Sequence, residues 1–169
     1  GGTIALFYLL AHQHAISAAV ISAPPLGIKM GPPTFIKALV PKLAAIAPSL
    51  RINSGLKPAW ISRDEKVVAA YKADPLVHSR ISLSLFSGMF IGGKHILANA
   101  EKISLPVFML YGSDDVIIRQ LDVDVAFAKL ASRDKKRMVF AGDYHEVHNE
   151  VNQLVEFEAV WEWLKPKCD

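Results

Sequence analysis

The sequence is poor in the features that mark several large classes of protein. Its 169 residues include a single cysteine, Cys168, so no internal disulfide can form and nothing indicates an oxidising compartment. The apolar run that begins at Thr3 is interrupted at His12 and is too short to span a bilayer. Lys and Arg are scattered without interleaved aromatics, and the net charge of +3 does not favour a nucleic-acid partner. We expect a cytoplasmic or peripheral membrane protein.

The chain also lacks an ordinary beginning. It opens with Gly1 and Gly2 before an apolar stretch, without the charged region that starts a signal peptide. None of its serines stands in Gly-x-Ser-x-Gly, the strand-to-helix turn that exposes a nucleophilic serine. A pair of glycines leading into an apolar helix is typical of the segment directly after such a turn. We therefore expect an N-terminal half of the fold, including the nucleophile, to be missing from this chain.

What is present is an alternation of short apolar strands and amphipathic helices. About half of the residues, 51%, are hydrophobic, which is enough for one domain with a core. Strands that alternate with helices predict a parallel sheet, and three strands with buried faces need further strands beside them. The expected strands cover residues 18–23, 106–111 and 137–141, and the expected helices cover residues 3–17, 119–131 and 151–164.

The predicted elements divide the chain into three parts. Residues 1–25 are a helix and the strand after it. Residues 26–104 are rich in proline and contain short helical pieces at 34–47 and 64–72, which predicts an inserted helical cap. Residues 105–169 form a C-terminal α/β core that carries two polar loops.

The two polar loops hold the candidate catalytic residues. Asp114 and Asp115 follow the strand at 106–111, and His145 lies in the loop after the next strand. Because the carboxyl ends of adjacent parallel strands lie side by side, a carboxylate after one strand can meet an imidazole after the next. On these residues alone, either Asp114 or Asp115 could orient an imidazole of the next loop, which would act as a general base.

Simpler interpretations of the same residues remain open. Asp115 could be an ordinary turn residue and His145 a surface histidine. The loop also contains Glu146 and His148, but these residues lack a third metal ligand at a recognised spacing. We expect neither a metal nor a cofactor.

Five segments, in the same order along the chain, resemble the monoacylglycerol lipase and lysophospholipase branch of the α/β-hydrolases, the serine aminopeptidase-like family. In that family the nucleophile turn commonly reads Gly-His-Ser-Met-Gly-Gly, and the cap contains Tyr-x-x-Asp-Pro-Leu. The matching segments are Gly1–Ala5 after the nucleophile, Val20–Pro24 before the cap, Tyr71–Leu76 within it, Pro106–Asp115 at the acid strand and Gly142–Glu146 at the histidine loop.

The resemblance implies a fold and an activity. The fold would be α/β: the C-terminal portion of an α/β-hydrolase parallel sheet with an inserted helical cap. The activity would be hydrolysis of a lipid-like ester, such as a monoacylglycerol or a lysophospholipid, by a serine two positions before Gly1, with Asp115 and His145 completing the triad. Since the serine and both oxyanion donors are absent, we expect this chain alone to be inactive.

Two other functions stay open. Epoxide hydrolases and dehalogenases share this fold but use an aspartate nucleophile. Alternatively, the chain could be a non-catalytic fragment or pseudoenzyme that binds lipid or a partner. One apolar helix face in the cap could line an acyl tunnel, contact a membrane surface or form the core of the cap. That face comprises Phe35, Ile36, Leu39, Val40, Leu43 and Ile46.

Overall fold

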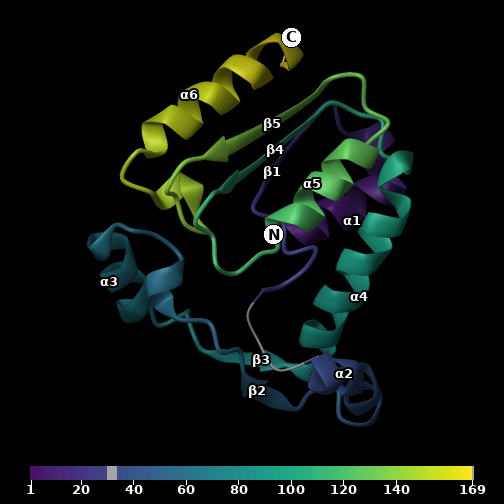
Figure 1. Ribbon diagram of the computed structural model, residues 1–169, viewed down its shortest axis with the longest axis vertical. Coiled ribbons are helices and arrows are strands. Elements are labelled where there is room, and N and C mark those ends of the chain that lie inside the picture. Colours follow the sequence, from purple (N-terminus) through teal and green to yellow (C-terminus); the bar gives the residue numbers. More distant parts are fainter. Residues whose placement is uncertain (30–33, 169) are drawn as a thin grey trace.

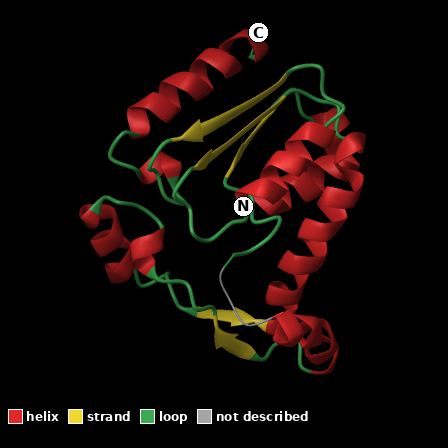
Figure 2. Cartoon of the chain, viewed as in Figure 1, coloured by secondary structure: helices red, strands yellow, loops and turns green. Residues whose placement is uncertain are grey.

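The computed structural model describes the backbone of residues 1–29 and 34–168, and the side chains of these residues except 34–38. Strands and helices alternate along most of it (Figure 2). The strands are β1 (Ala19–Ser22), β2 (Arg51–Asn53), β3 (Arg80–Ser82), β4 (Val107–Gly112) and β5 (Lys135–Phe140). The α-helices are α1 (Gly2–His12), α2 (Thr34–Ile46), α3 (Glu65–Ala73), α4 (Leu83–Asn99), α5 (Gln120–Lys129) and α6 (Gln153–Leu164).

The main sheet has three parallel strands in the order β1-β4-β5. Ala19 pairs with Val107, and Val107 pairs with Lys135, so all three strands run in the same direction. The predicted parallel sheet is therefore confirmed, and its strands begin and end within two residues of the expected positions. The central strand β4 is buried along its whole length, as its continuous apolar run indicates.

The alternation of side chains along β4 builds two cores. Val107, Met109 and Tyr111 contribute to the larger core, under α1, α4 and α5. Phe108 and Leu110 point to the opposite face, where α6 packs over them through Trp163. Figure 1 shows the helices on the two faces of the sheet. Burial of each of these large side chains stabilises the fold by about 1.5–3 kcal/mol.

Helix α4 connects this sheet to the segment predicted to be a cap. Its beginning, capped by Ser82, follows the small antiparallel sheet of β2 and β3, and its far half packs against α1 (Figure 1). Ile96 and Ala100, at its end, are buried in the larger core. Residues 26–104 therefore contribute to the core as well. A separate cap role for this segment stays a prediction.

The sequence predicts that the apolar face of the helix at 119–131 comprises Leu121, Val125, Phe127, Ala128 and Leu130. Leu130 is buried and Phe127 packs against the larger core, as predicted, but the prediction is wrong for Leu121 and Val125, which are 65% and 39% exposed. The buried face of α5 is formed by Val123, Ala126 and Leu130. The helix has apolar residues on more than one side, and only its docking on the sheet selects between them.

Two other helices expose apolar side chains that the sequence predicted to be buried. Because the helix at 3–17 is apolar nearly all round, the sequence predicts that it is buried on several sides. The helix at 151–164 is predicted to bury Leu154, Phe157, Val160, Trp161 and Leu164, of which Val160 and Leu164 do pack against the second core. The exposed residues are Ile4, Phe7 and Tyr8 on α1 and Leu154, Phe157 and Trp161 on α6. Thr3, Leu6 and Leu9 are the buried residues of α1, and Glu156 and Trp163 are those of α6. In the part of the chain that the structure describes, each helix therefore leaves one apolar face largely exposed.

The apolar face expected in α2 is mixed. Val40 is buried, whereas Leu39, Leu43 and Ile46 are exposed. The side chains of Phe35 and Ile36 lie outside the described residues. Among the helices that the structure describes, none combines the length and the apolar character that crossing a bilayer requires.

Candidate active site

The site lies where β4 and β5 end, and close backbone contact brings their two loops together. Ser113 N donates to Phe140 O at 2.9 Å, and Asp114 N donates to Asp143 O at 3.0 Å. Gly112, the last residue of β4, makes this approach possible. A Cβ atom there would lie 2.1 Å from the carbonyl oxygen of Asp143, so any larger residue would push the loops apart.

Asp115 and His145 meet at this point. When Asp115 is ionised, the N–H group at His145 Nδ1 donates a hydrogen bond to Asp115 Oδ2, with 2.7 Å between the two atoms. The Asp115 carboxylate is fully buried, and its Oδ1 accepts hydrogen bonds from the backbone N–H groups of Ile117 at 2.7 Å and Ile118 at 3.2 Å. One carboxylate oxygen is thus held by the backbone, which leaves the other to fix the imidazole.

Two side chains hold the backbone of the acid loop. Lys29 Nζ and Gln120 Nε2 both donate to the carbonyl oxygen of Asp115, at 3.1 and 2.8 Å. Sequence reasoning missed both residues. Lys29 is 86 positions away from Asp115, so no local spacing could have indicated the contact.

The histidine loop is held against residues 60 and 61. Gly142 begins the loop with a φ of +78°, in the left-handed region that favours glycine. Glu146 N donates to Ile61 O at 2.8 Å, and His145 N lies 3.5 Å from Trp60 O. The backbone of the candidate base is therefore tied to a segment that precedes it by more than eighty positions.

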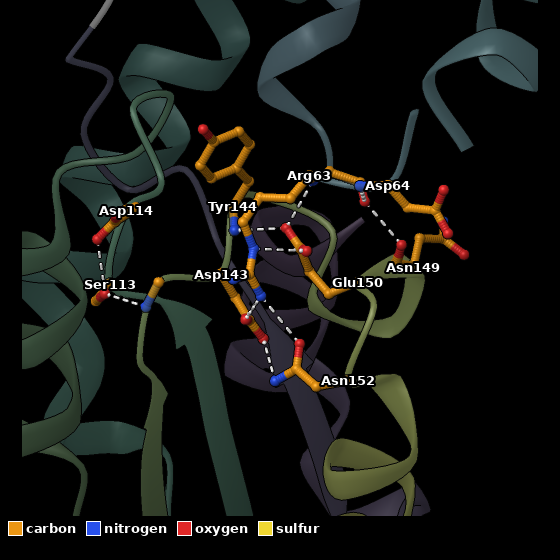
Figure 3. A network of polar contacts seen from close by, with 11 residues as sticks. Arg63, Asp64, Ser113, Asp114, Asp143, Tyr144, Asn149, Glu150 and Asn152 are labelled. Carbon is orange, nitrogen blue, oxygen red and sulfur yellow. Dashed lines mark hydrogen bonds and ion pairs between the residues drawn. The ribbon is translucent and has the colours of Figure 1, made fainter. Parts of the chain in front are cut away.

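A buried polar network lies beside the histidine loop. Figure 3 shows Arg63 between Asp143, Glu150 and Asn152. Burial raises the pKa of the Asp143 carboxyl above its ordinary value, whereas the hydrogen bond from Asn152 and the charge of Arg63 act in the opposite direction. No sequence pattern indicated this network, because Arg63 lies 80 and 87 positions from its two acidic partners.

The other candidates in these loops lie outside the Asp115–His145 pair. Asp114 is exposed and accepts a hydrogen bond from Ser113 Oγ at 2.8 Å (Figure 3). His148 is exposed three residues beyond His145. Within residues 1–29 and 34–168, the structure has no cluster of three His, Cys, Asp or Glu side chains that could hold a metal ion.

His145 opens onto a cavity that reaches the start of the chain. This cavity, of about 570 Å³, is lined by His145 and His148 and also by Gly1 and Gly2. An apolar groove of about 760 Å³ runs between α1 and α4. Its lining and that of the cavity share Gly1, Pro25 and Met89, so apolar space adjoins the imidazole.

An imidazole fixed by a buried carboxylate beside an apolar cavity is suited to proton transfer in acyl chemistry. The family model described as serine aminopeptidase, S33, matches residues 1–152. The chain belongs to this hydrolase family. The arrangement of its elements is that of an α/β-hydrolase, as the match to a solved lipase of the same fold demonstrates.

Three relatives illustrate the similarity. A monoacylglycerol lipase of Mycolicibacterium smegmatis is 30% identical over 165 residues, which cover 97% of this chain and 59% of that protein. A phospholipase of Bacillus subtilis is 26% identical over 161 residues, covering 94% of this chain and 62% of the relative. The crystal structure of the Paleococcus ferrophilus monoacylglycerol lipase is 35% identical with a TM-score of 0.92, over 97% of this chain and 64% of the other.

Each comparison covers nearly all of this chain but a smaller share of the relative. This chain is matched almost completely, but it spans only 59% of the mycobacterial relative. The relatives support a hydrolase of lipid esters as the family activity. Because part of each relative has no counterpart in these 169 residues, the activity, substrates and partners of the whole protein are proposals.

Proposed function

We propose that this chain is the C-terminal part of a serine hydrolase that acts on lipid-like carboxylic esters, with a monoacylglycerol or a lysophospholipid as substrate. The nucleophilic serine would come from a segment that precedes Gly1. Asp115 and His145 would be the acid and the base of its triad. On this proposal, the 169 residues alone do not turn over an ester.

The contact between Asp115 and His145 carries the proposal. Asp115 Oδ2 and His145 Nδ1 are 2.7 Å apart, at the carboxyl ends of neighbouring parallel strands. The chain that holds them belongs to a serine hydrolase family. With Nδ1 engaged by Asp115, the nitrogen left to exchange a proton with the reacting groups is Nε2. The cavity next to His145 is lined by Gly1, which is the side from which the serine would arrive.

The reaction would proceed in two halves. The serine oxygen attacks the ester carbonyl while His145 Nε2 takes its proton, and His145 then gives that proton to the departing alcohol. A water molecule next attacks the acyl-enzyme and loses a proton to His145, which gives that proton to the departing serine oxygen as the serine–acyl bond breaks and the fatty acid is released. Asp115 holds the imidazole and stabilises its charged form in both halves.

The lipid character of the substrate is supported by the apolar groove and by the named relatives. The groove between α1 and α4 is lined mainly by side chains such as Ile4, Phe7 and Met89 and adjoins the cavity that His145 lines. The exposed Leu39, Leu43 and Ile46 on α2 would let this segment contact a membrane surface, from which a lipid ester could enter.

The first experiment sequences the gene upstream of the codon for Gly1. A Gly-x-Ser whose serine lies two positions before Gly1 would support the proposal, whereas an aspartate in place of that serine would move the protein to epoxide hydrolase or dehalogenase chemistry. A start codon at this boundary without a partner chain would favour a non-catalytic binding protein.

The second experiment expresses the complete gene product and measures hydrolysis of a monoacylglycerol and labelling by a fluorophosphonate. We expect His145→Ala to lower kcat by at least about a thousandfold, because the serine then has no base. His14→Ala, at an exposed histidine that lines neither the cavity nor the groove, is the matched control and should stay within about threefold of wild type. Near-normal hydrolysis by His145→Ala would contradict the proposal.

A further inference from the structure

We infer that Arg63 is a positioning residue for the reaction, because its guanidinium fixes the loop that carries His145 at both ends of that loop. This inference rests on the proposed function, in which His145 is the base. Arg63 does not line the cavity next to His145, so any effect on turnover would act through the loop.

Arg63 contacts the two buried acidic side chains of the loop. Its Nη2 binds Asp143 Oδ1, its Nε donates to Glu150 Oε2 at 3.0 Å, and its backbone N donates to Glu150 Oε1 at 3.1 Å. Nη2 also donates to Asn152 Oδ1 at 3.1 Å, and Asn152 in turn donates to Asp143 Oδ2 at 3.2 Å. Figure 3 shows these side chains converging on the guanidinium.

The two acidic residues that Arg63 contacts lie on either side of the candidate base along the chain. Asp143 precedes His145 by two residues, and Glu150 follows it by five. Glu150 Oε1 also accepts from the backbone N of Tyr144 at 2.8 Å, directly before His145. One guanidinium therefore sets the separation between the beginning and the end of the loop.

The same short segment holds the middle of the loop. Glu146 N donates to Ile61 O at 2.8 Å, and Ser62 Oγ donates to Asn149 O at 2.8 Å. Residues 60–63 thus run beside residues 143–150, joined by backbone bonds at one end and by Arg63 at the other. A shift of this segment would move the imidazole relative to the serine.

Charge explains why an arginine is required here. The side chains of Asp143 and Glu150 are fully buried, whereas that of Arg63 is 35% exposed. Without the guanidinium, two buried carboxylates would face each other without a cation, and the loop would have to separate them or take up protons. A lysine supplies one charge but cannot present the planar fork that reaches both carboxylates.

The test compares arginine variants in the complete gene product with p-nitrophenyl butyrate as the ester. We expect Arg63→Met to lower kcat by about a hundredfold while KM changes less than about threefold, because a displacement of the base by about 1 Å costs that much. Arg63→Lys should lie between Arg63→Met and wild type. Free guanidinium ions should restore part of the kcat of Arg63→Met and none of that of His145→Ala.

Arg137 offers a matched control. Its side chain is 38% exposed and forms an ion pair with Asp124, away from the histidine loop. Arg137→Met should keep kcat within about twofold of wild type. If Arg63→Met fails to fold, Arg63→Lys, with the same kcat and KM measurements, carries the comparison with Arg137→Met.

The outcomes separate this inference from the proposed function. If His145→Ala is inactive but a folded Arg63 variant matches Arg137→Met, Arg63 does not position the base, and the inference is overturned. A loss that falls on KM alone, or one that guanidinium leaves unchanged, overturns it as well. If His145→Ala remains active, the proposed function itself fails.

Discussion

Two regions of this molecule differ in how completely their polar or apolar groups are paired or buried by other residues of the chain. Around Asp115 and His145, the buried carboxylate oxygens of Asp115 and Glu150 all have hydrogen-bond partners within the chain. Along the outer face of α1, apolar side chains such as Ile4 and Phe7 are 70% and 50% exposed. The same contrast appears on α6, which exposes Phe157 and Trp161.

This difference indicates which parts of the fold are completed by contacts within this chain and which parts need further protein. Buried charges without partners cost much more free energy than exposed apolar side chains, so a polar site has to be completed by its own residues or distort. An apolar face can stay exposed at a smaller cost in free energy until a partner buries it. We therefore expect the acid–base pair to be preorganised in this chain, and the faces of α1 and α6 to depend on further protein.

The largest expected effect comes from the acid. Asp115→Asn should lower kcat of the complete protein by about 10³–10⁴-fold, because an amide cannot hold the imidazole in the tautomer that accepts a proton at Nε2. Steady-state ester hydrolysis checks this. Asp114→Asn is the control, since Asp114 is exposed and bonds Ser113 instead. Equal losses in the two variants would show that Asp115 has no special role.

Next in size is the glycine between the two catalytic loops. Gly112→Ala should lower the free energy of unfolding by about 3 kcal/mol or more, because its Cβ would collide with rigid backbone oxygens of Asp143 and Tyr144.

Chemical denaturation measures this change against Gly88→Ala. Gly88 is exposed within α4, and a methyl group added there would have no atom within 4 Å, so alanine should raise stability by about 0.5–1 kcal/mol. A stable, fully active Gly112→Ala protein would mean that the loops can separate without cost.

The open apolar face gives an effect of intermediate size. In the 169-residue chain, Leu6→Ala should cost about 3 kcal/mol, because Leu6 is fully buried, whereas Phe7→Ala should cost less than about 1 kcal/mol. In the complete gene product, we expect the cost of Phe7→Ala to rise toward that of Leu6→Ala. Unfolding curves of both lengths test this, and an unchanged cost of Phe7→Ala would mean that α1 stays uncovered.

The smallest expected effect concerns Glu156, a buried carboxyl on α6. Burial, together with the nearby charge of Asp143, raises its pKa from 4.5 to about 7. Between these values the folded state binds more protons than the unfolded state, so this group makes stability fall as the pH rises from about 4.5 to about 7, and its cost persists at higher pH.

Glu156→Gln should therefore stabilise the protein at pH 8 by about 1 kcal/mol and have little effect at pH 4.5. Thermal unfolding across this range measures the difference. Glu158→Gln, an exposed change on the same helix, is the control and should be neutral at both pH values. A pH-independent effect of Glu156→Gln would show that its carboxyl is not destabilised by burial.

The sequence by itself determined the parallel strands and the pairing of the acid with the histidine. Continuous apolar runs at 107–111 predict a buried strand, and adjacency of parallel strand ends is a geometric consequence of the sheet. These local patterns predict that an acid after one strand meets a histidine after the next. The resemblance to the hydrolase family selected Asp115 and His145, and the 2.7 Å contact confirms that these two side chains meet. Their catalytic roles stay a prediction.

The tertiary structure alone decided which helix faces are buried and what supports the histidine loop. Helix α5 carries apolar residues on several sides, and docking on the sheet selected Val123 and Ala126 over Leu121. Arg63 meets Asp143 and Glu150 across 80 and 87 positions, a distance over which no periodicity or motif carries information. Long-range polar contacts depend on the packing of whole elements, because they form only after hydrophobic burial has brought those elements together.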